Sequence, residues 1–289
     1  MSELMTFSYT RQDLSLLPRR PAESNKGTFG RVLCVCGSKG MAGAAYLCAK
    51  ATLRCGAGLV EIFTPEENRI VLQTLLPEAI VTTYDADEPQ LHELERAVSR
   101  ATAIVCGCGL GTSRQASSIL GRVLRSSSVP TVLDADALNI LSRNAALMKY
   151  AKGKIITPHL YEMSRLTRID AEQIAAEATT VCQSFAQSHE LVCVLKGHRT
   201  AVSDGGASVY INRSGNSGMS TAGAGDVLAG VIGGILAQNR DGALSEFQVA
   251  SLGVYIHGLS GDAAAEMLGE YSVIASDIID CLPKILKHV

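Results

Sequence analysis

Residues 216–234 read Asn-Ser-Gly-Met-Ser-Thr-Ala-Gly-Ala-Gly-Asp-Val-Leu-Ala-Gly-Val-Ile-Gly-Gly, a glycine-rich loop that runs into a helix. After Asp226, apolar residues recur at helical spacing and predict one buried face over 227–236. The first backbone N–H groups of a helix lack intrahelical partners and lie at its positive end, so they attract phosphate oxygens. Small residues at 223–225 would let such a ligand come close to the backbone. The stretch therefore predicts an anion site at the start of a helix.

Asp226 stands inside this run of small residues, where its negative charge would repel a phosphate. Two interpretations are open. In the first, the carboxylate acts as a base or holds a metal ion beside the phosphates. In the second, it is an acid of the first helical turn that the helix dipole stabilises. The glycine spacing alone does not decide between them.

The composition is typical of a folded globular protein, with 47% hydrophobic and 19% charged residues in 289. The formal net charge of −2 argues against a general binder of nucleic acids or anionic membranes. The first residues lack the apolar core of a signal peptide, and the longest apolar helical run is too short to cross a bilayer. We therefore expect a cytoplasmic protein that binds neither nucleic acid nor membrane.

The nine cysteines include no Cys-x-x-Cys motif and no zinc-ligand spacing. Cys34 and Cys36 share one face of a predicted strand, and Cys106 and Cys108 lie at the end of another. We expect reduced side chains that are mostly buried as small hydrophobic groups, which is usual in the cytosol.

Short apolar runs alternate with helical segments along the chain. Strands are predicted at 31–36, 59–63, 102–106, 130–134, 154–157 and 191–196, and helices at 44–55, 91–100, 113–125, 171–189, 225–238, 245–268 and 276–287. Two more strands, 200–203 and 208–212, flank an Asp-Gly-Gly turn and predict a hairpin. This order predicts an α/β fold with a mostly parallel sheet, helices on both faces and a small antiparallel hairpin near one edge. Residues 1–25 are interpreted as a lead-in arm with a short helix at most, and 26–289 as one domain.

The loops after the strands carry the polar residues, and ligands of parallel sheets bind outside the carboxyl ends of strands. The loops at 37–44 and 107–111 are rich in glycine but lack the dinucleotide-binding spacing, and no P-loop motif occurs. Tight turns would explain part of these glycines. Asp134 and Asp136 are candidates for holding Mg²⁺ or a ribose, although Asp136 alternatively caps the next helix.

Two further loops follow strands, at Thr157-Pro158-His159 and at Lys196. Thr157 followed by Pro158 is favourable at the start of a helix. This capping interpretation explains Thr157 and Pro158, but it does not explain His159. A single histidine is more often structural than functional. Lys196 would neutralise a phosphate or carbonyl, or else belong to a solvated turn. Together the loops place phosphate-binding chemistry at one edge of the sheet.

These motifs, in this order, resemble the ADP/ATP-dependent NAD(P)H-hydrate dehydratases, which have a ribokinase-like fold. The resemblance covers about residues 26–285 and includes Thr157-Pro158-His159, Lys196-Gly197 with Thr200, Asp134 to Asn139, and the run 216–230. Three positions depart from the pattern: Ser217 replaces Pro, Ala224 replaces Thr, and Cys108 replaces the Pro of Gly-Pro-Gly-Leu-Gly. Ala224 lacks a hydroxyl, so only its backbone N–H can contact a phosphate.

The resemblance implies repair of hydrated NADH or NADPH, in which the reduced nicotinamide ring carries a hydroxyl. A phosphoryl group from ADP or ATP activates the hydroxyl of the S-epimer, and phosphate then leaves, so the enzyme is a carbon–oxygen lyase. Mg²⁺ is implied at the donor phosphates, although its ligands cannot be read from the sequence. A homo-oligomer, commonly a tetramer, is also implied. Because only about 25 residues precede the motif region, far fewer than a domain needs, we expect a separate NAD(P)H-hydrate epimerase in the same pathway.

The resemblance also implies roles for individual residues. Asp226 is implied as the base, and the implied anion hole consists of the N–H groups of Gly223, Ala224, Gly225 and Asp226. The implied adenine-nucleotide side consists of Lys196, Gly197, His198, Arg199, Thr200 and Gly225. The implied hydrated-dinucleotide side consists of Ala44, Gly109, His159 and Asp226.

Two other functions remain alternatives. A small-molecule kinase of the same fold, acting on a sugar or a vitamin-precursor alcohol, would share the Gly-x-Gly-Asp helix start. A catalytically silent nucleotide sensor is less compatible with the complete Asp226 loop. The sequence leaves open the choice between ADP and ATP and between the two hydrates.

Overall fold

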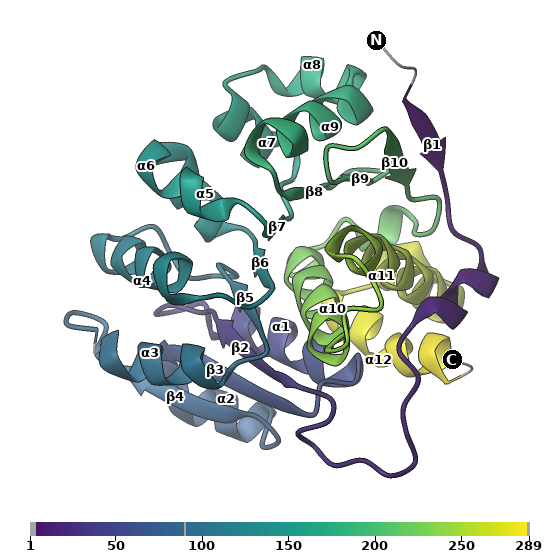
Figure 1. Cartoon of the computed structure of the whole chain (residues 1–289). Coiled ribbons are helices and arrows are strands. Elements are labelled where there is room, and N and C mark those ends of the chain that lie inside the picture. Colours follow the sequence, from purple (N-terminus) through teal and green to yellow (C-terminus); the bar gives the residue numbers. More distant parts are fainter. Residues whose placement is uncertain (1–3, 90, 288–289) are drawn as a thin grey trace.

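The computed structural model describes residues 4–89 and 91–287, whose centre is a ten-stranded sheet with helices on both faces (Figure 1). The strand order is β1 (Met5–Phe7), β10 (Ser208–Ile211), β9 (Ala201–Ser203), β8 (Val192–Leu195), β7 (Ile155–Ile156), β6 (Thr131–Leu133), β5 (Ala103–Cys106), β2 (Arg31–Val35), β3 (Leu59–Pro65) and β4 (Ile80–Tyr84). Strand β9 is antiparallel to both β8 and β10, and the other pairs are parallel. The predicted mostly parallel α/β sheet with an antiparallel hairpin near one edge is confirmed.

Alternate residues of each central strand pack against two different helical layers, because successive side chains of a strand point to opposite faces of the sheet. On β2, Val32 and Cys34 pack into one core and Leu33 and Val35 into the other, and all four are fully buried. Burial on both faces explains why the central strands read as continuous apolar runs.

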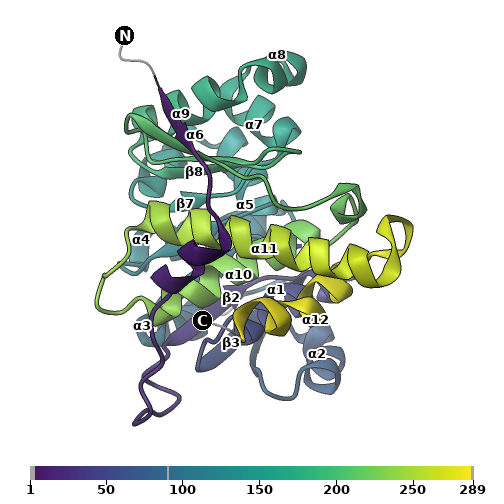
Figure 2. The same ribbon diagram turned by 90° about the vertical axis from the view of Figure 1, so that its right-hand side faces the viewer.

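The two layers contain different parts of the chain. One consists of α1 (Ala42–Arg54), α2 (Arg69–Leu75), α10 (Ala224–Gln238), α11 (Glu246–Leu268) and α12 (Ala275–Leu286), and Figure 2 turns it toward the viewer. The other consists of α3 (Leu91–Arg100), α4 (Arg114–Ser126), α5 (Asp136–Arg143), α6 (Ala145–Met148), α7 (Leu160–Thr167), α8 (Ala171–Ala176) and α9 (Ala178–His189). The predicted anion site thus begins the central helix of the first layer.

Glycines of α10 allow close packing against α1. A Cβ atom on Gly230 would lie 2.2 Å from the carbonyl oxygen of Cys48, and one on Gly234 would lie 2.7 Å from that of Thr52. Thr52 Oγ1 also donates a hydrogen bond to the carbonyl of Gly230 at 3.1 Å. The two backbones therefore touch directly, which holds the start of α10 in a defined place above the sheet.

Replacing Gly230 with Ala should destabilise the protein by about 1–3 kcal/mol, although alanine is intrinsically the better helix former. The added methyl would meet backbone of α1 rather than a movable side chain. Gly43→Ala is the matched control, because a Cβ there meets no atom within 4 Å, so it should leave stability unchanged or raise it by up to about 1 kcal/mol. Urea unfolding of the three proteins measures the difference. Equal midpoints would contradict the packing argument.

Some elements were not predicted. Residues 1–25 were expected to hold a short helix at most, and this was wrong, because β1 pairs in parallel with β10 at the edge of the sheet. A 3₁₀ helix at Arg11–Leu16 follows it. The elements α2 and β4 were also missed, since β4 is an edge strand with largely exposed or half-buried residues. The single domain at 26–289 stays a prediction, and its last two residues, like residues 1–3 of the arm, lie outside the described residues.

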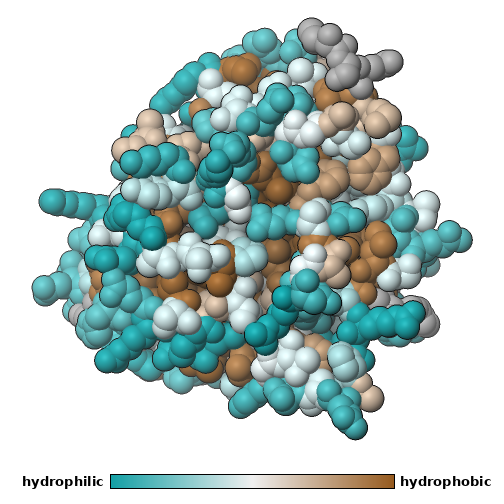
Figure 3. Space-filling view, in the orientation of Figure 1, coloured by the Kyte–Doolittle hydropathy of each residue, from teal (hydrophilic) through white to brown (hydrophobic). Residues whose placement is uncertain are grey.

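All nine cysteines are free and buried, which confirms the expectation that they pack as small apolar groups. The face seen in Figure 1 is mostly hydrophilic, with hydrophobic residues exposed in several separate areas (Figure 3). Ile70 and Leu75 of α2 are among the large apolar side chains exposed to solvent. Of the helices in the described part of the chain, none is both long enough and apolar enough to span a membrane.

Candidate functional site

The loops that were expected to carry the function meet at the carboxyl ends of neighbouring strands. Strand β2 lies between β3 and β5, so successive strands are added to the sheet in opposite directions on its two sides, and ligands of such folds bind at this switch point. The N–H of Gly37, after β2, donates to the carbonyl of Cys108, after β5, at 2.8 Å. His159, after β7, forms a β-bridge with Lys196, after β8. The separate motifs are therefore joined by backbone hydrogen bonds.

Lys196 is the cation at the centre of these loops. Its Nζ donates to Asp134 Oδ1 at 2.7 Å and lies 3.9 Å from Glu162 Oε2. Asp134 also accepts a hydrogen bond from Thr157 Oγ1 at 2.6 Å, and its side chain is only 2% exposed. Burial alone would lower the pKa of Lys196, but attraction to Asp134 and Glu162 raises it above the usual value. The ammonium therefore stays charged and in a fixed position.

Helix α10 starts directly opposite this ammonium. Gly223 is its N-cap, with a φ of 89° that glycine adopts without strain. The N–H of Val227 makes the first helical hydrogen bond, to the carbonyl of Gly223 at 3.0 Å, so the N–H groups of residues 225 and 226 precede the helical ladder. A Cβ on Gly225 would lie 3.3 Å from Lys196 Nζ. The helix start and the lysine thus face one space with two sources of positive potential.

Asp226, in the first turn of α10, is half-buried beside Cys108 and Asp134, and one ligand atom from each of these three lies within 4.8 Å of the others. Burial raises the pKa of Asp226 to about 9; Cys108 and Asp134 contribute, and Lys196 opposes the shift. A carboxylate that merely complemented the helix dipole would have a lowered pKa instead. The arrangement therefore favours a carboxyl group that exchanges a proton.

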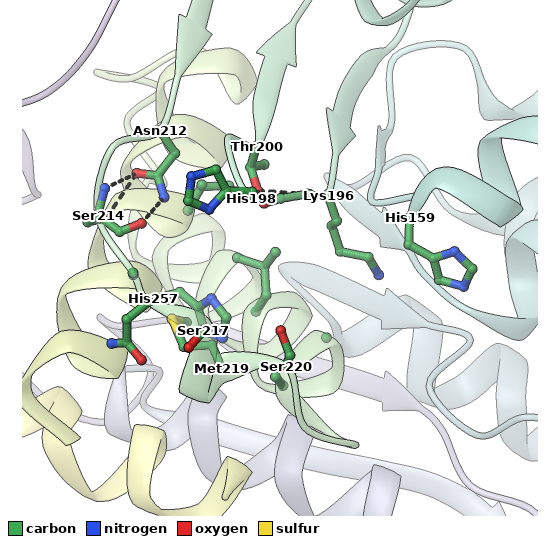
Figure 4. Close-up of a pocket in the computed structure, with 18 of the residues that line it drawn as sticks. His159, Lys196, His198, Thr200, Asn212, Ser214, Ser217, Met219, Ser220 and His257 are labelled. Atoms are coloured by element: carbon green, nitrogen blue, oxygen red, sulfur yellow. Dashed lines mark hydrogen bonds between the residues drawn. The ribbon is translucent and has the colours of Figure 1, made fainter. Parts of the chain in front are cut away.

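A cavity of about 550 Å³ opens beside Lys196 and the start of α10 (Figure 4). In the close-up, Lys196 and His159 lie along one side of it at the strand ends, while the 3₁₀ helix Ser217–Met219 borders it from another side. His198 and Thr200 belong to the loop between β8 and β9. The cavity is large enough for a small-molecule ligand.

Most residues predicted for the adenine nucleotide border this cavity. They are Lys196, Gly197, His198, Thr200 and Gly225. Arg199 does not border it, because its exposed side chain lines a separate groove with Arg213. Ala44 and Gly109, predicted for the dinucleotide, follow the neighbouring strands β2 and β5 and lie against each other. A Cβ on Gly109 would come within 2.8 Å of Ala44 Cβ. The predicted residues thus fall into a group around the cavity, the pair Ala44 and Gly109, and Arg199 in its separate groove, while Gly223 and Asp226 do not line the cavity.

His159 is the N-cap of α7. Its Nδ1 accepts hydrogen bonds from the N–H groups of Tyr161 at 3.1 Å and Glu162 at 3.3 Å, and Glu162 accepts from the N–H of His159 at 2.8 Å. The interpretation of Thr157 and Pro158 as the capping residues was wrong, because the Thr157 hydroxyl bonds Asp134. Burial lowers the pKa of His159, which suits a neutral ring that accepts at Nδ1. Capping therefore orients a ring that also lines the cavity.

Asp136 does not cap α5. The N-cap is Ala135, with a φ of 48°, and Asp136 is the first helical residue. Its Oδ2 accepts from the N–H of Gly111 at 2.8 Å and its Oδ1 from Asn139 Nδ2 at 3.2 Å. Asp136 therefore holds the loop after β5 against α5, and the capping interpretation was wrong.

Two residues of this region were not predicted from the sequence. Glu162 lies beside Lys196, and burial raises its pKa to about 7. His257 of α11 lines the cavity; burial lowers its pKa to about 4, and its Nε2 has no hydrogen-bond partner among the described residues. The available signal for His257 was a single histidine inside an apolar helix. The available signal for Glu162 was an acidic residue three positions after His159, the spacing of a capping box.

Comparisons with known proteins agree with this geometry. The sequence profile of the NAD(P)H-hydrate dehydratase family matches residues 32–284. The chain is 38% identical to an ADP-dependent (S)-NAD(P)H-hydrate dehydratase of Neisseria meningitidis, over 86% of this chain and 82% of that protein. It also matches bifunctional NAD(P)H-hydrate repair enzymes, such as that of Moorella thermoacetica (36% identity over 99% of this chain), but spans only about half of their length, 54% in that case.

Solved structures with a similar fold include a member of the same enzyme family. A ribokinase-like superfamily protein of Enterococcus faecalis superposes with a TM-score of 0.86 at 30% identity, covering 98% of this chain and 96% of that one. An ADP/ATP-dependent NAD(P)H-hydrate dehydratase of Bacillus subtilis, co-crystallised with ATP and Mg²⁺, superposes with a TM-score of 0.83 at 26% identity, covering 100% and 99%. The fold is ribokinase-like, and the chain belongs to the NAD(P)H-hydrate dehydratase family.

Proposed function

We propose that this chain dehydrates the S-epimer of hydrated NADH or NADPH and uses ADP, or less favourably ATP, as phosphoryl donor. The observation that carries the proposal is the placement of Asp226 at the anion-attracting start of α10, a helix start that faces the fixed ammonium of Lys196, and the raised pKa of Asp226 supports it. The Neisseria relative, named an ADP-dependent (S)-NAD(P)H-hydrate dehydratase, supports the donor and the substrate.

In this proposal, Asp226 takes the proton from the ring hydroxyl as the hydroxyl oxygen attacks the terminal phosphorus of the nucleotide. The bond from that phosphorus to its bridging oxygen breaks, and AMP (from ADP) or ADP (from ATP) leaves. The N–H groups of residues 223, 225 and 226 stabilise the charge that spreads over the transferring oxygens, whereas the N–H of Ala224 already donates to the carbonyl of Thr221 at 3.4 Å. Lys196 adds a positive charge on the same side. Phosphate is a far better leaving group than hydroxide, so the lone pair of the ring nitrogen expels it. A proton then leaves the neighbouring ring carbon and restores the double bond.

Mg²⁺ would neutralise the donor phosphates when bound. It usually binds proteins through one or two carboxylates together with substrate phosphates. Asp134 and Asp226 fit such a partial ligand set, because their oxygens lie within 4.8 Å of each other, although Asp134 Oδ1 is already bonded to Lys196 and Thr157. The Bacillus relative crystallised with ATP and Mg²⁺ supports this part of the proposal.

The remaining expectations belong to the same proposal. The nine free, buried cysteines suit a reducing compartment and support a cytoplasmic location. The exposed apolar residues of α2 support a homo-oligomer, of which a tetramer is the form expected from the resemblance. A separate epimerase would supply the S-epimer from the R-epimer.

The test is turnover of authentic hydrated NADH and NADPH with ADP and with ATP, compared side by side. We expect the absorbance of the reduced nicotinamide to return and inorganic phosphate to appear in equal amounts. A stable phosphorylated alcohol with no restored absorbance would indicate a small-molecule kinase instead. Binding of nucleotide without release of phosphate from any tested substrate would indicate a sensor.

The value of kcat/KM should rise with pH and level off only above about pH 9, the pKa of Asp226 in the free protein, because a general base must be unprotonated. Below that pKa the expected slope is about tenfold per pH unit. Measuring initial rates in overlapping buffers from about pH 6 to 10 tests this. A profile that is flat across neutral pH would show that the base has an ordinary carboxyl pKa.

A further inference from the structure

Three cysteines from separate elements bring their sulfur atoms together beside Asp226. Cys36 follows β2, Cys48 lies in α1, and Cys108 lies in the loop after β5. Their three Sγ atoms all lie within 4.8 Å of one another, and all three residues are fully buried. Thiolates bound to one Zn²⁺ at about 2.3 Å stand roughly 3.8 Å apart in tetrahedral geometry. The three sulfur atoms are therefore close to the spacing that one shared ion requires.

The fold, and not the spacing along the chain, creates this cluster. Cys36 and Cys108 are held together because the N–H of Gly37 bonds the carbonyl of Cys108 at 2.8 Å. Cys48 reaches them from the helical layer, where α1 packs against α10 at Gly230. No Cys-x-x-Cys motif marks such a site, so a motif search does not detect it.

Cys108 joins the cluster to the candidate active site. Its Sγ lies 3.7 Å from Asp134 Oδ2 and within 4.8 Å of a carboxylate oxygen of Asp226. An ion held there would place positive charge beside Asp226.

We propose that Cys36, Cys48 and Cys108 form a binding site for one Zn²⁺ ion. Thiolates favour Zn²⁺ over hard ions such as Mg²⁺, so this site would be chemically distinct from the Mg²⁺ expected at the nucleotide phosphates. Zn²⁺ binds thiolates, so its binding displaces protons from these buried thiols, which requires a metal with high thiolate affinity.

The first experiment titrates the reduced full-length protein with Co²⁺, a spectroscopic substitute for Zn²⁺. We expect one Co²⁺ per chain with a thiolate-to-cobalt charge-transfer band, which Zn²⁺ abolishes and excess Mg²⁺ does not. Cys48→Ala and Cys108→Ala should each weaken Co²⁺ binding by at least about tenfold and reduce the band. Cys55→Ala is the matched control, because Cys55 is buried at the end of α1 but lies outside the cluster. Absence of the band, or equal effects of Cys55→Ala and Cys48→Ala, would overturn the proposal.

A second measurement needs no variant and so does not depend on whether a substituted protein folds. Calorimetry of Zn²⁺ binding in two buffers with different ionisation enthalpies counts the protons released. We expect about two to three protons per ion near neutral pH, because buried neutral thiols become thiolates. A release near zero would show that Zn²⁺ binds elsewhere. Turnover of the hydrates without added Zn²⁺ tests the dehydratase proposal separately.

Discussion

Replacing Asp226 with Asn should lower kcat for hydrate dehydration by about 10²–10⁴-fold. Asparagine has nearly the same shape, so the start of α10 keeps its packing and its N–H groups. It cannot accept the proton of the attacking hydroxyl, however. Binding of ADP, followed by calorimetry, should change by no more than about threefold, because the proposed anion hole is made of backbone N–H groups.

The matched control is Asp280→Asn, which removes an exposed carboxylate from the same layer of helices. Asp280 is 58% exposed and pairs with Lys50 at 3.1 Å. It should leave kcat unchanged, because the pair lies on the surface. Near-full activity in Asp226→Asn would show that another group acts as the base. Loss of ADP binding together with turnover would mean that the carboxylate holds the nucleotide or its metal ion.

The same substitution should stabilise the protein at alkaline pH. The pKa of Asp226 is raised from 3.8 to about 9 in the folded protein. Between these values the unfolded chain is ionised while the folded one holds a proton, so stability falls as pH rises through this window. Asparagine does not titrate and removes this loss. We expect Asp226→Asn to be more stable by about 1–3 kcal/mol at pH 8 and nearly equal to the wild type at pH 4, as measured by urea unfolding.

The parts of the fold that could be predicted are those with a long, regular burial pattern. Helix α3 has the predicted bounds, 91–100, because its apolar residues recur on one face. Strand β2 was predicted to within one residue, because it is buried on both faces. Strand β1 was missed because its three residues are all exposed and its place depends on pairing with β10. Edge strands of this kind carry almost no local signal.

The site could be predicted where a residue's place follows from strand order alone. Lys196 and His159 end adjacent parallel strands, so their loops must meet. The positions of Glu162 and His257 depend on how α7 and α11 pack, which motif spacing does not describe. The same is true of the sulfur of Cys48, which reaches Cys36 and Cys108 only after α1 docks. Packing between layers is thus the step that sequence patterns leave out.

Replacing Lys196 with Met should cost about 3–5 kcal/mol of stability, because it leaves the buried carboxylate of Asp134 without its cation. The Asp134 side chain is 2% exposed and lies 2.7 Å from Lys196 Nζ. Turnover and nucleotide binding should also be lost, since the ammonium faces the start of α10. The control is Lys152→Met: Lys152 pairs with Glu190 at 2.6 Å, but both side chains are more than 60% exposed. That change should cost less than about 1 kcal/mol.

The double variant Lys196→Met with Asp134→Asn separates the structural role of this pair from its chemical role. Asparagine at 134 still accepts the hydrogen bond from Thr157 but carries no charge, so most of the lost stability should return. Nucleotide affinity and turnover should stay lost, because no cation then faces the helix start. Urea unfolding and ADP calorimetry on the single and double variants measure the two effects. Recovery of ADP binding together with stability would show that Lys196 only neutralises Asp134. The N–H groups of α10 alone would then bind the phosphate.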